Sequence, residues 1–311
     1  MIAFVFPGQG SQKVGMGRAL ADAYPAARQV FDEADEALGE SLSTLCWEGP
    51  DEMLTLTENT QPAILTASIA AYRALESEGL AEGASFMAGH SLGEYSAHVA
   101  AGTFSFADAV RTVRRRGRYM QEAVPLGTGA MSAILGLDAD KVTQACVEAA
   151  NGEVVAPANL NGGGQVVIAG AKAAVERAGA RAKELGAKRV IPLSVSAPFH
   201  CALMKPAEDR LAPDLRALHV VNPRVPVVAN VDAEPKRDGA AAIDALIRQV
   251  SSAVRWDELV RRLASEGVTA YVEVGSGSVL SGLIRKIHRD ASVANVGAPD
   301  DISGARALLS R

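Results

Sequence analysis

Apolar runs and amphipathic patterns alternate along this chain in a way that is typical of an α/β protein. Short apolar runs that end at turn residues predict strands at residues 2–6, 84–90, 225–231 and 270–274. Apolar residues at helical intervals predict helices at residues 17–38, 61–79, 106–123, 240–249 and 256–266, directly after Ser91, and from residue 202. The pattern therefore indicates a mixed α/β fold.

The middle of the chain has a different rhythm. Strand and helix patterns follow one another there in the order β-α-β-β-α-β, over residues 131–137, 138–150, 153–158, 165–169, 171–185 and 189–195. Asn161-Gly162-Gly163-Gly164 is a strong turn signal between the two central strands. This order is that of the ferredoxin-like motif. We predict that residues 1–125 and 196–311 form one large α/β domain, and that residues 126–195 form an inserted ferredoxin-like small domain.

Composition and charge narrow the classes of function. Of the 311 residues, 48% are hydrophobic and 22% charged, so the chain can bury a sizeable core. Its 31 basic and 36 acidic side chains give a net charge of -5, which argues against nucleic acid or an anionic membrane as the main partner. No apolar stretch approaches the roughly 20 residues of a membrane helix. The cysteines, Cys46, Cys146 and Cys201, have neither metal-ligand nor disulfide spacing, so we expect a cytoplasmic protein without a metal site.

Gly89-His90-Ser91-Leu92-Gly93 matches the G-x-S-x-G pattern of a nucleophile elbow. A predicted strand precedes this motif and a predicted helix follows it, as an elbow requires. The two glycines leave room in the sharp turn for the Ser91 hydroxyl to project, and the N–H of Leu92 at the helix start can stabilise an oxyanion. A glycine-rich connection with an incidental serine is the alternative, and the strand–turn–helix context favours the nucleophile.

A serine nucleophile needs a base, and histidine is the usual one. The chain has five histidines: His90, His98, His200, His219 and His288. The first two lie on the elbow or on the helix after it, the fourth ends a helical stretch, and the fifth stands in a solvated basic run. His200 follows an irregular loop directly after the 126–195 segment, where catalytic residues are common. Spacing favours His200 only modestly over a histidine that is buried for structural reasons.

The helix predicted at residues 106–123 carries one arginine that does not face solvent. Its apolar face consists of Phe106, Ala109, Val110, Val113, Gly117 and Met120. The opposite, solvated face carries Arg111, Arg114, Arg115 and Arg118. Arg116 borders the apolar face instead, and a guanidinium turned inward needs an anionic partner. An internal ion pair and a clamp for a substrate carboxylate fit this position equally well.

Gly8-Gln9-Gly10-Ser11-Gln12 ends the first predicted strand. Open α/β sheets bind ligands at the carboxyl ends of their strands, so the N–H groups of this loop can supply a second oxyanion donor. The loop lacks the following Gly-Lys-Ser/Thr of a phosphate loop. We therefore interpret it as a weak candidate for a phosphate loop and as a candidate source of an oxyanion donor.

Several separated motifs together resemble the malonyl-CoA:acyl-carrier-protein transacylases of fatty acid synthesis. They are Phe6 to Gln12, Gly89 to Glu94, Arg116-Gly117 with Met120-Gln121, Gly164 to Gly170, Pro198-Phe199-His200-Cys201, and Gln249-Val250 with Val254-Arg255-Trp256. The resemblance covers nearly the whole chain and implies an α/β-hydrolase-like large domain with a ferredoxin-like insert. One departure is Gly275-Ser276-Gly277-Ser278, where the family often has Gly-Pro-Gly-Lys; we expect it to alter a loop and not the chemistry.

The resemblance implies a role for each matching residue of the acyl-transfer machinery. It maps the nucleophile onto Ser91 and the general base onto His200. It implies that the backbone carbonyl of Gln249, and not an acidic third residue, orients the histidine. It assigns the oxyanion hole to the N–H groups of Gln9 and Leu92. These roles make a catalytic dyad.

The resemblance also implies how the substrate is selected. Arg116 matches the residue that holds the malonyl carboxylate, which decides between the two interpretations left open by spacing. Met120 and Phe199 are the supporting positions. Phe199 stands where many bacterial members have serine, and in related polyketide acyltransferases a Phe before the histidine accompanies malonyl over methylmalonyl. The departure at Phe199 therefore fits malonyl.

The implied activity is transfer of malonyl from malonyl-CoA to the phosphopantetheine thiol of acyl carrier protein, through malonyl-Ser91 in ping-pong order. Malonyl-CoA and acyl carrier protein are the implied partners, and we expect a monomer that needs no cofactor. An acyltransferase of a polyketide synthase or of a malonate decarboxylase system would share these motifs. From other classes, a serine esterase would leave Arg116 without a task, and a non-catalytic carrier-binding module would leave elbow, base and clamp unused.

Overall fold

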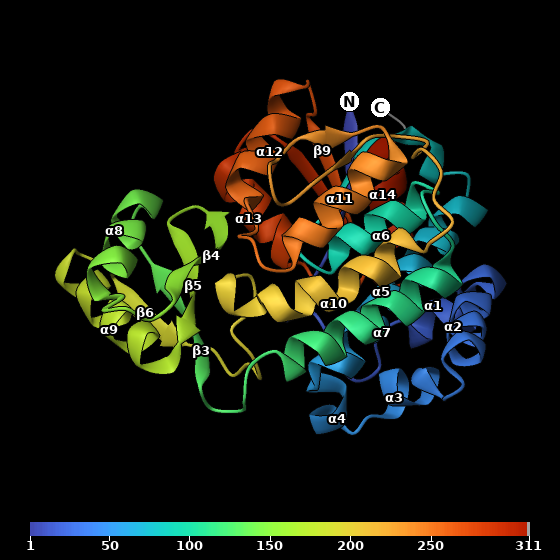
Figure 1. Ribbon diagram of the computed structural model, residues 1–311. Helices are drawn as coiled ribbons and strands as arrows, with labels where there is room; N and C mark the ends of the chain where they lie inside the picture. The colour runs from blue at the N-terminus through green and yellow to red at the C-terminus, as the bar shows by residue number, and fades with distance from the viewer. Residues whose placement is uncertain (310–311) are drawn as a thin grey trace.

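A mainly parallel sheet of six strands forms the centre of the larger part of the protein (Figure 1). The structure is a computed structural model, and it describes residues 1–309. The strand order is β10-β9-β1-β2-β7-β8, and within it only β7 and β8 pair antiparallel. The strands are β1 (Ile2–Phe6), β2 (Ala84–Gly89), β7 (Val227–Val228), β8 (Pro235–Lys236), β9 (Ala270–Val274) and β10 (Ser292–Val296).

Both faces of this sheet are buried. The side chains of β1 alternate, so that Phe4 and Phe6 enter one hydrophobic core while Ala3 and Val5 enter another on the opposite face. The second core is closed by α12 (Trp256–Ser265) and α13 (Val279–Ile287). The first core is covered by α1 (Arg18–Ala23), α2 (Pro25–Leu38), α3 (Leu42–Glu48), α4 (Asp51–Thr55), α5 (Thr57–Ser77), α6 (Gly93–Ala100), α7 (Phe106–Glu122), α10 (Lys205–Arg216), α11 (Gly239–Gln249) and α14 (Asp301–Leu309).

Several of the predicted elements need correction. The single helix predicted at residues 17–38 is two helices, because Pro25 starts α2 and holds the residue before it, Tyr24, in an extended conformation with φ of -126°. The strand predicted at 225–231 is only the short β7. The patterns also missed β10, whose residues are mostly half-buried at the edge of the sheet.

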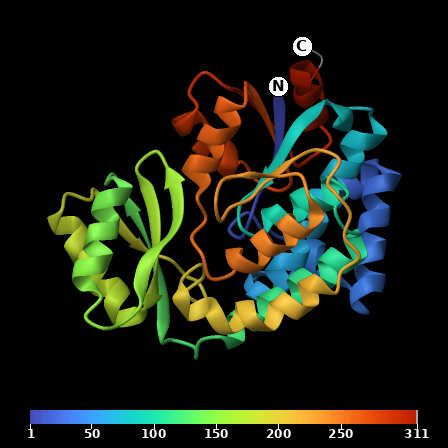
Figure 2. The same cartoon turned by 45° about the horizontal axis from the view of Figure 1, so that its top comes forward.

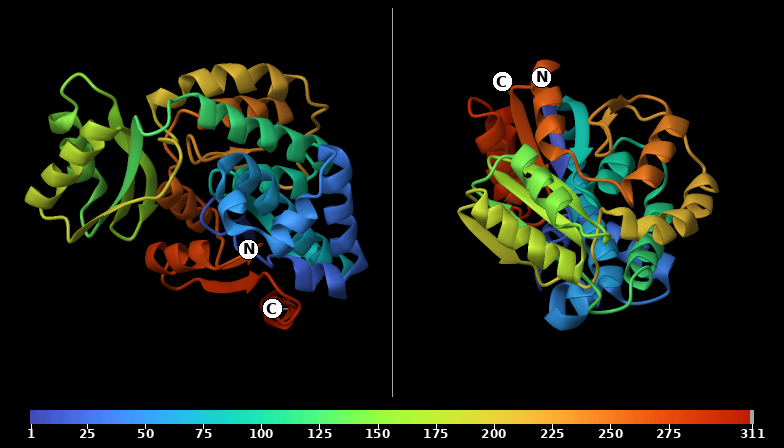
Figure 3. Two further views of the ribbon diagram at one scale, coloured as in Figure 1. Left: turned by 90° about the horizontal axis from the view of Figure 1, so that it is seen from below. Right: turned by 60° about the vertical axis from the view of Figure 1, so that its left-hand side comes forward.

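Residues 129–192 build a separate antiparallel sheet of four strands, in the order β4-β5-β3-β6. Along the chain its elements are β3 (Gly129–Leu135), α8 (Ala139–Ala149), β4 (Val155–Gly162), β5 (Gln165–Ala171), α9 (Lys172–Glu184) and β6 (Arg189–Pro192). This is the predicted order of elements. The small sheet and its helices stand to one side of the larger part in Figure 2 and in the left panel of Figure 3.

The two faces of the small sheet have different tasks. Ile134 and Ile168 point into a local core beneath α8 and α9, while Met131 and Val167 belong to the core cluster of the larger part. The helices α8 and α9 cover the side of the small sheet that faces away from the larger part (Figure 3). The inner face of the small sheet therefore forms a wall against the large sheet. Within residues 1–309, none of the helices is both long and apolar enough to cross a membrane.

The parallel pairing of the strands brings the loops that follow them to one edge of the sheet. Strand β1 pairs with β2 so that Phe6 lies opposite Gly89, and it pairs with β9 on its other side. Because parallel strands end at the same edge, the loops after Phe6, Gly89 and Val274 all lie at the carboxyl edge of the sheet. The loop after Val228 reaches the same edge, since β7 is parallel to β2.

Candidate active site

Ser91 occupies the tip of the turn between β2 and α6. Its φ of 52° lies in the left-handed region, which a residue other than glycine adopts only when its surroundings require it. Asn230, in the loop after β7, holds this turn from one side. The Ser91 N–H donates to Asn230 Oδ1 at 2.6 Å, and Asn230 Nδ2 donates to the Gly89 carbonyl at 2.7 Å. The turn is therefore fixed by its own contacts before any substrate binds.

The two glycines of the motif are required by close backbone contacts. A Cβ atom on Gly89 would lie 1.9 Å from the carbonyl carbon of Gly93, and a Cβ atom on Gly93 would lie 2.0 Å from the carbonyl oxygen of Phe6. Either contact is far inside van der Waals range, so neither position accepts a side chain without movement of the backbone. The steric argument for the elbow is thus met at both glycines.

His200 lies directly against Ser91. Its Nε2 atom is 2.6 Å from the Ser91 Oγ atom, and its Nδ1 atom is 3.0 Å from the backbone oxygen of Gln249. Because a carbonyl oxygen only accepts, Nδ1 carries the hydrogen and Nε2 is free to accept one. Burial of His200, together with the nearby charge of Arg116, lowers its pKa to about 3. The ring is therefore neutral at pH 7 and able to take the serine proton.

Arg116 of α7 is buried beside the same hydroxyl group, with a relative exposure of 2%. Its Nη1 atom donates to Gln61 Oε1 at 2.7 Å, and its Nη2 atom donates to Gln249 Oε1 at 2.9 Å and to Ser91 Oγ at 3.1 Å. No carboxylate of residues 1–309 pairs with the guanidinium, so an internal ion pair is not its role within this part of the chain. The guanidinium also lies over the Tyr95 ring, with 5.4 Å between Cζ and the ring centroid. A buried cation held by neutral oxygens and an aromatic ring is arranged to receive an anion.

The two residues predicted to supply the oxyanion donors lie beside Ser91 in the same cavity. Gln9 follows β1, and Leu92 precedes the first residue of α6; both line the same cavity. Within residues 1–309 neither N–H group has a hydrogen-bond partner, whereas the N–H groups of the next residues in α6 are bonded within the turn. The Gln9 loop is anchored by Thr57, whose hydroxyl donates to Gln9 Oε1 at 2.9 Å. Free N–H groups beside an activated hydroxyl are the geometry of an oxyanion hole.

A cavity of about 270 Å³ joins these groups. Ser91, His200 and Arg116 line it together with the predicted supporting side chains Met120 and Phe199. The inner face of the small sheet closes its other side, through the side chains of Met131 and Val167 among others. The cavity therefore lies between the carboxyl edge of the large sheet and the wall of the small one, with Gln249 directly behind it.

The sequence patterns missed several polar residues of this cavity, among them Gln61, His90 and Asn161. Gln61 is buried in α5, where it follows the polar residues Thr57-Glu58-Asn59-Thr60 and precedes Pro62, so the local pattern gave no signal that set it apart. His90, set aside as a base, places Nε2 2.9 Å from Asn161 Oδ1 of β4. The turn motif that contains Asn161 was interpreted only as a hairpin connection. His90 and Asn161 together link the elbow to the small sheet.

The remaining histidines lie away from Ser91. His98 is fully buried in α6 and bonds Thr103 Oγ1 at 3.1 Å, and His219 is exposed. His288 is half-buried and not fully solvated as expected, because its Nδ1 atom lies 3.1 Å from the Tyr271 hydroxyl. None of these contacts brings a histidine other than His200 into bonding distance of the Ser91 hydroxyl within residues 1–309.

The predicted solvated face of α7 is only partly correct. Arg111, Arg115 and Arg118 are about half exposed and pair with surface carboxylates. The side chain of Arg114 is only 13% exposed and contacts Glu40 and Asn59. Across residues 1–309, no cluster of three or more histidine, cysteine, aspartate or glutamate side chains is arranged to hold a metal ion.

The chain is similar to known proteins over nearly its whole length. The acyl transferase domain family matches residues 3–301. The malonyl CoA-acyl carrier protein transacylase of Escherichia coli K12 is 53% identical over 98% of this chain and 99% of that protein. An acyl carrier protein S-malonyltransferase from Vibrio cholerae superposes with a TM-score of 0.95 at 50% identity, covering 97% of this chain and 99% of that one.

A third comparison includes a partner protein. A solved complex of a type II polyketide synthase acyl carrier protein with its malonyl-transacylase contains a chain that is 49% identical, with a TM-score of 0.95 and coverage of 98% of both chains. Identity of this degree over the full length of both proteins shows more than a shared fold. The chain belongs to the acyl transferase domain family and, within it, to the malonyl CoA-acyl carrier protein transacylases.

Proposed function

We propose that this enzyme transfers a malonyl group from malonyl-CoA to the phosphopantetheine thiol of an acyl carrier protein, in fatty acid synthesis, with Ser91 as the acyl carrier. The observation that supports this most strongly is one constellation: a serine 2.6 Å from a neutral histidine and 3.1 Å from a buried arginine that no carboxylate of residues 1–309 neutralises. An activated hydroxyl beside an unpaired cation suits an acyl group that carries its own carboxylate.

The first half-reaction forms the malonyl ester. His200 Nε2 takes the Ser91 proton while Oγ attacks the thioester carbonyl of malonyl-CoA. The oxygen of the tetrahedral intermediate accepts hydrogen bonds from the N–H groups of Gln9 and Leu92. The C–S bond then breaks, and the imidazolium returns its proton to the departing thiolate of coenzyme A. One ester bond replaces one thioester bond, and the enzyme is left as malonyl-Ser91 with a neutral His200.

The second half-reaction reverses these steps with a different thiol. The phosphopantetheine thiol of acyl carrier protein gives its proton to His200 and attacks the ester carbonyl of malonyl-Ser91. The same two N–H groups hold the oxyanion, and Ser91 leaves with the proton from His200. Because the Gln249 carbonyl fixes the ring from the Nδ1 side at 3.0 Å, the base needs no acidic partner to keep its tautomer.

Arg116 supplies selectivity for malonyl over acetyl. A malonyl carboxylate that reaches the guanidinium gains charge-assisted hydrogen bonds, whereas an acetyl group leaves the cation buried without an anion. Phe199 and Met120 are apolar and line the cavity beside it, which limits the room for a branched acyl chain. We assign both residues the task of shaping the acyl pocket around the malonyl group.

The proposed division of the chain supports this chemistry. We assign residues 1–125 and 196–311 to an α/β-hydrolase-like domain that holds nucleophile, base and clamp, and residues 126–195 to a ferredoxin-like small domain that closes the acyl pocket. The element order and strand order given above are consistent with both names. All three cysteines are free and buried, which supports a reducing, cytoplasmic setting.

A second setting for the same chemistry has an observation of its own. One of the similar structures is a malonyl-transacylase bound to the acyl carrier protein of a type II polyketide synthase, at 49% identity. Service to a polyketide synthase is therefore the alternative pathway for this enzyme. A serine esterase is disfavoured, because His200 is oriented by a backbone carbonyl and Arg116 would be buried without a task.

Intact-protein mass spectrometry after mixing with malonyl-, methylmalonyl- or acetyl-CoA tests the function. We expect a malonyl adduct on the wild-type enzyme, none on Ser91→Ala, and release of the adduct by holo-acyl carrier protein but not by water. Rapid hydrolysis of the adduct without transfer to a thiol would favour the esterase. Comparing carrier proteins of fatty acid and polyketide synthesis as acceptors decides between the two pathways.

A further inference from the structure

Glu94 is a buried carboxylate that the proposed chemistry does not use. It lies in the first turn of α6, three residues after Ser91, and is fully buried. No lysine, arginine or histidine of residues 1–309 forms an ion pair with it; instead its Oε2 atom accepts from the Asn230 N–H at 2.9 Å and from Gln249 Nε2 at 2.7 Å. Burial without a cation is costly for a carboxylate, so its retention behind the nucleophile calls for a reason.

The contact with Gln249 gives that reason. The Gln249 side chain is fully buried, and its two ends meet different groups. Its oxygen accepts from Arg116 Nη2 at 2.9 Å, while its nitrogen donates to the Ser91 carbonyl at 2.9 Å and to Glu94 at 2.7 Å. An amide turned over would set its NH₂ group against the guanidinium and its oxygen against the carboxylate. Glu94, at the shorter distance, and the Ser91 carbonyl are therefore the acceptors that select the orientation in which Gln249 can hold Arg116.

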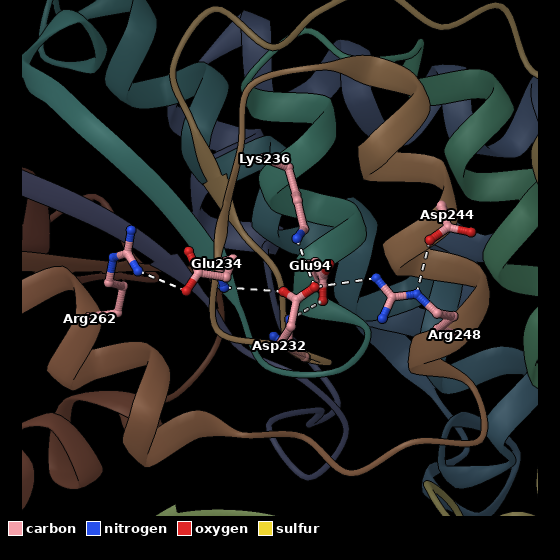
Figure 4. Close-up of polar contacts among 8 residues, drawn as sticks. Glu94, Asp232, Glu234, Lys236, Asp244, Arg248 and Arg262 are labelled. Carbon is pink, nitrogen blue, oxygen red and sulfur yellow. Dashed lines mark hydrogen bonds and ion pairs between the residues drawn. The ribbon is translucent and has the colours of Figure 1, made fainter.

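The other nearby carboxylate does not share this task. Asp232 lies beside Glu94, but Lys236 donates to it at 2.8 Å and Arg248 donates to it at 3.3 Å (Figure 4). Glu234 lies on the far side of Asp232 and pairs with Arg262. Asp232 and Glu234 are thus paired with the basic side chains of this network. The donor end of the Gln249 amide bonds Glu94 instead.

On the basis of the proposed function, we propose that Glu94 is a positioning residue for malonyl selectivity. Its Oε2 atom holds the donor end of the Gln249 amide, so that the acceptor end holds Arg116 beside the Ser91 hydroxyl. Without this acceptor the amide loses its shortest contact, and the Ser91 carbonyl at 2.9 Å holds its donor end less firmly. When the amide turns, the guanidinium keeps Gln61 and the Ser91 hydroxyl as its neutral partners. The clamp for the malonyl carboxylate then loosens, whereas acetyl transfer, which uses no clamp, continues.

The base is insulated from the change. His200 is held by the backbone oxygen of Gln249 and not by its side chain, so a turn of the amide leaves the proton acceptor in place. Burial raises the pKa of Glu94 to about 7, and Asn230, Gln249, Asp232 and Arg116 are the groups that face it. In either protonation state the Oε2 atom can still accept both hydrogen bonds, so the acceptor, and not the charge, is the feature that matters.

Two substitutions of similar length separate the acceptor from the rest of the side chain. Glu94→Gln keeps an oxygen that can accept both bonds, and Glu94→Met fills the space without one. We expect the ratio of malonyl to acetyl acylation, each as kcat/KM per acylatable site, to fall about tenfold or more in Glu94→Met, the range for loss of a hydrogen bond to a charged group. In Glu94→Gln the same ratio should remain close to that of the wild type.

The controls separate this inference from the proposed function. Absence of any malonyl adduct on the wild-type enzyme would overturn the function itself. A normal wild-type adduct with an unchanged ratio in Glu94→Met would overturn only the role of Glu94, as would a ratio in Glu94→Gln as low as that of Glu94→Met. Gln249→Met decides the question if Glu94→Met does not fold: it removes the same bridge while keeping the carbonyl for His200, and it should lower the ratio equally. An unchanged ratio there also overturns the proposal.

Discussion

The Nε2 atom of His200 lies 2.6 Å from the Oγ atom of Ser91, although 109 residues separate them along the chain. The contact depends on the left-handed backbone at both residues, with φ of 52° at Ser91 and 59° at His200. It also depends on the Gln249 carbonyl, which fixes the other side of the imidazole ring at 3.0 Å. The geometry is thus set by three separate segments of the chain.

Removal of the base should abolish most of the acylation. In His200→Ala the Ser91 hydroxyl has no proton acceptor, so we expect the rate of malonyl-Ser91 formation to fall by about 10²–10⁴-fold, the usual contribution of a general base. Quench-flow with intact-protein mass spectrometry measures this rate directly. The melting temperature of the variant serves as the control for folding. Retention of the wild-type rate in a folded His200→Ala protein would exclude histidine as the base.

The elbow was predictable from sequence because its constraints are local. Gly89 and Gly93 are needed by contacts with each other and with the adjacent strand end at Phe6, and a G-x-S-x-G pattern between a strand and a helix expresses both. The contact between Ser91 and His200 was not predictable from spacing. It arises only when the loop after the small sheet packs against the carboxyl edge of the large one, and no local pattern encodes that packing.

Arg116 shows what helical periodicity can predict and what it cannot. Helical spacing placed it at the border of the apolar face, and the structure finds it 2% exposed. The choice between an internal ion pair and a substrate clamp depended on which side chains accept from the guanidinium. These are Gln61 and Gln249, which lie 55 and 133 residues away along the chain. Side chains that distant come together only through tertiary packing. For the same reason the partly buried Arg114 was wrongly placed on the solvated face.

Arg116→Ala should separate malonyl transfer from acetyl transfer. We expect acylation by malonyl-CoA to lose roughly 2–5 kcal/mol of transition-state stabilisation, as for truncation of one member of a buried charge pair. Acylation by acetyl-CoA should be spared or should rise, because the variant no longer has a buried guanidinium that an acetyl group leaves without an anion. The matched control is Arg115→Ala on the exposed face of the same helix, where the arginine pairs with Asp214 and does not contact Ser91. Equal loss with both substrates would contradict the clamp.

Acid should destabilise the protein through its buried histidines. Burial lowers the pKa of His98 to about 3, and no other group adds to this shift. The unfolded chain binds a proton at this histidine below its ordinary pKa of 6.5, while the folded protein does not. The stability present above pH 6.5 is therefore lost as the pH falls toward 3.

The prediction is tested by the slope of the free energy of unfolding against pH. Between pH 7 and pH 5 the wild type should lose on the order of 2 kcal/mol more in free energy of unfolding than His98→Gln, at about 1.4 kcal/mol per pH unit and bound proton. Urea unfolding at several pH values measures the difference. Within residues 1–309 the His98 ring bonds only Thr103, and it lies outside the cavity, so the comparison does not involve the acyl-transfer groups. Parallel slopes for the two proteins would show that His98 is protonated in the folded state.

Two glycine-to-alanine substitutions should have opposite effects. In Gly93→Ala the new Cβ atom would lie 2.0 Å from the carbonyl oxygen of Phe6, so the start of α6 must move away from β1. We expect a loss of about 1–3 kcal/mol of stability, as for overpacking elsewhere, and a fall in the acylation rate because Ser91 moves with the turn.

Gly282→Ala in α13 is the control, since its Cβ atom would have no heavy atom within 4 Å. That helical position should gain up to about 1 kcal/mol and keep its acylation rate. Urea unfolding and single-turnover acylation of the two variants check both effects, and a fully active, equally stable Gly93→Ala protein would show that the elbow tolerates a side chain there.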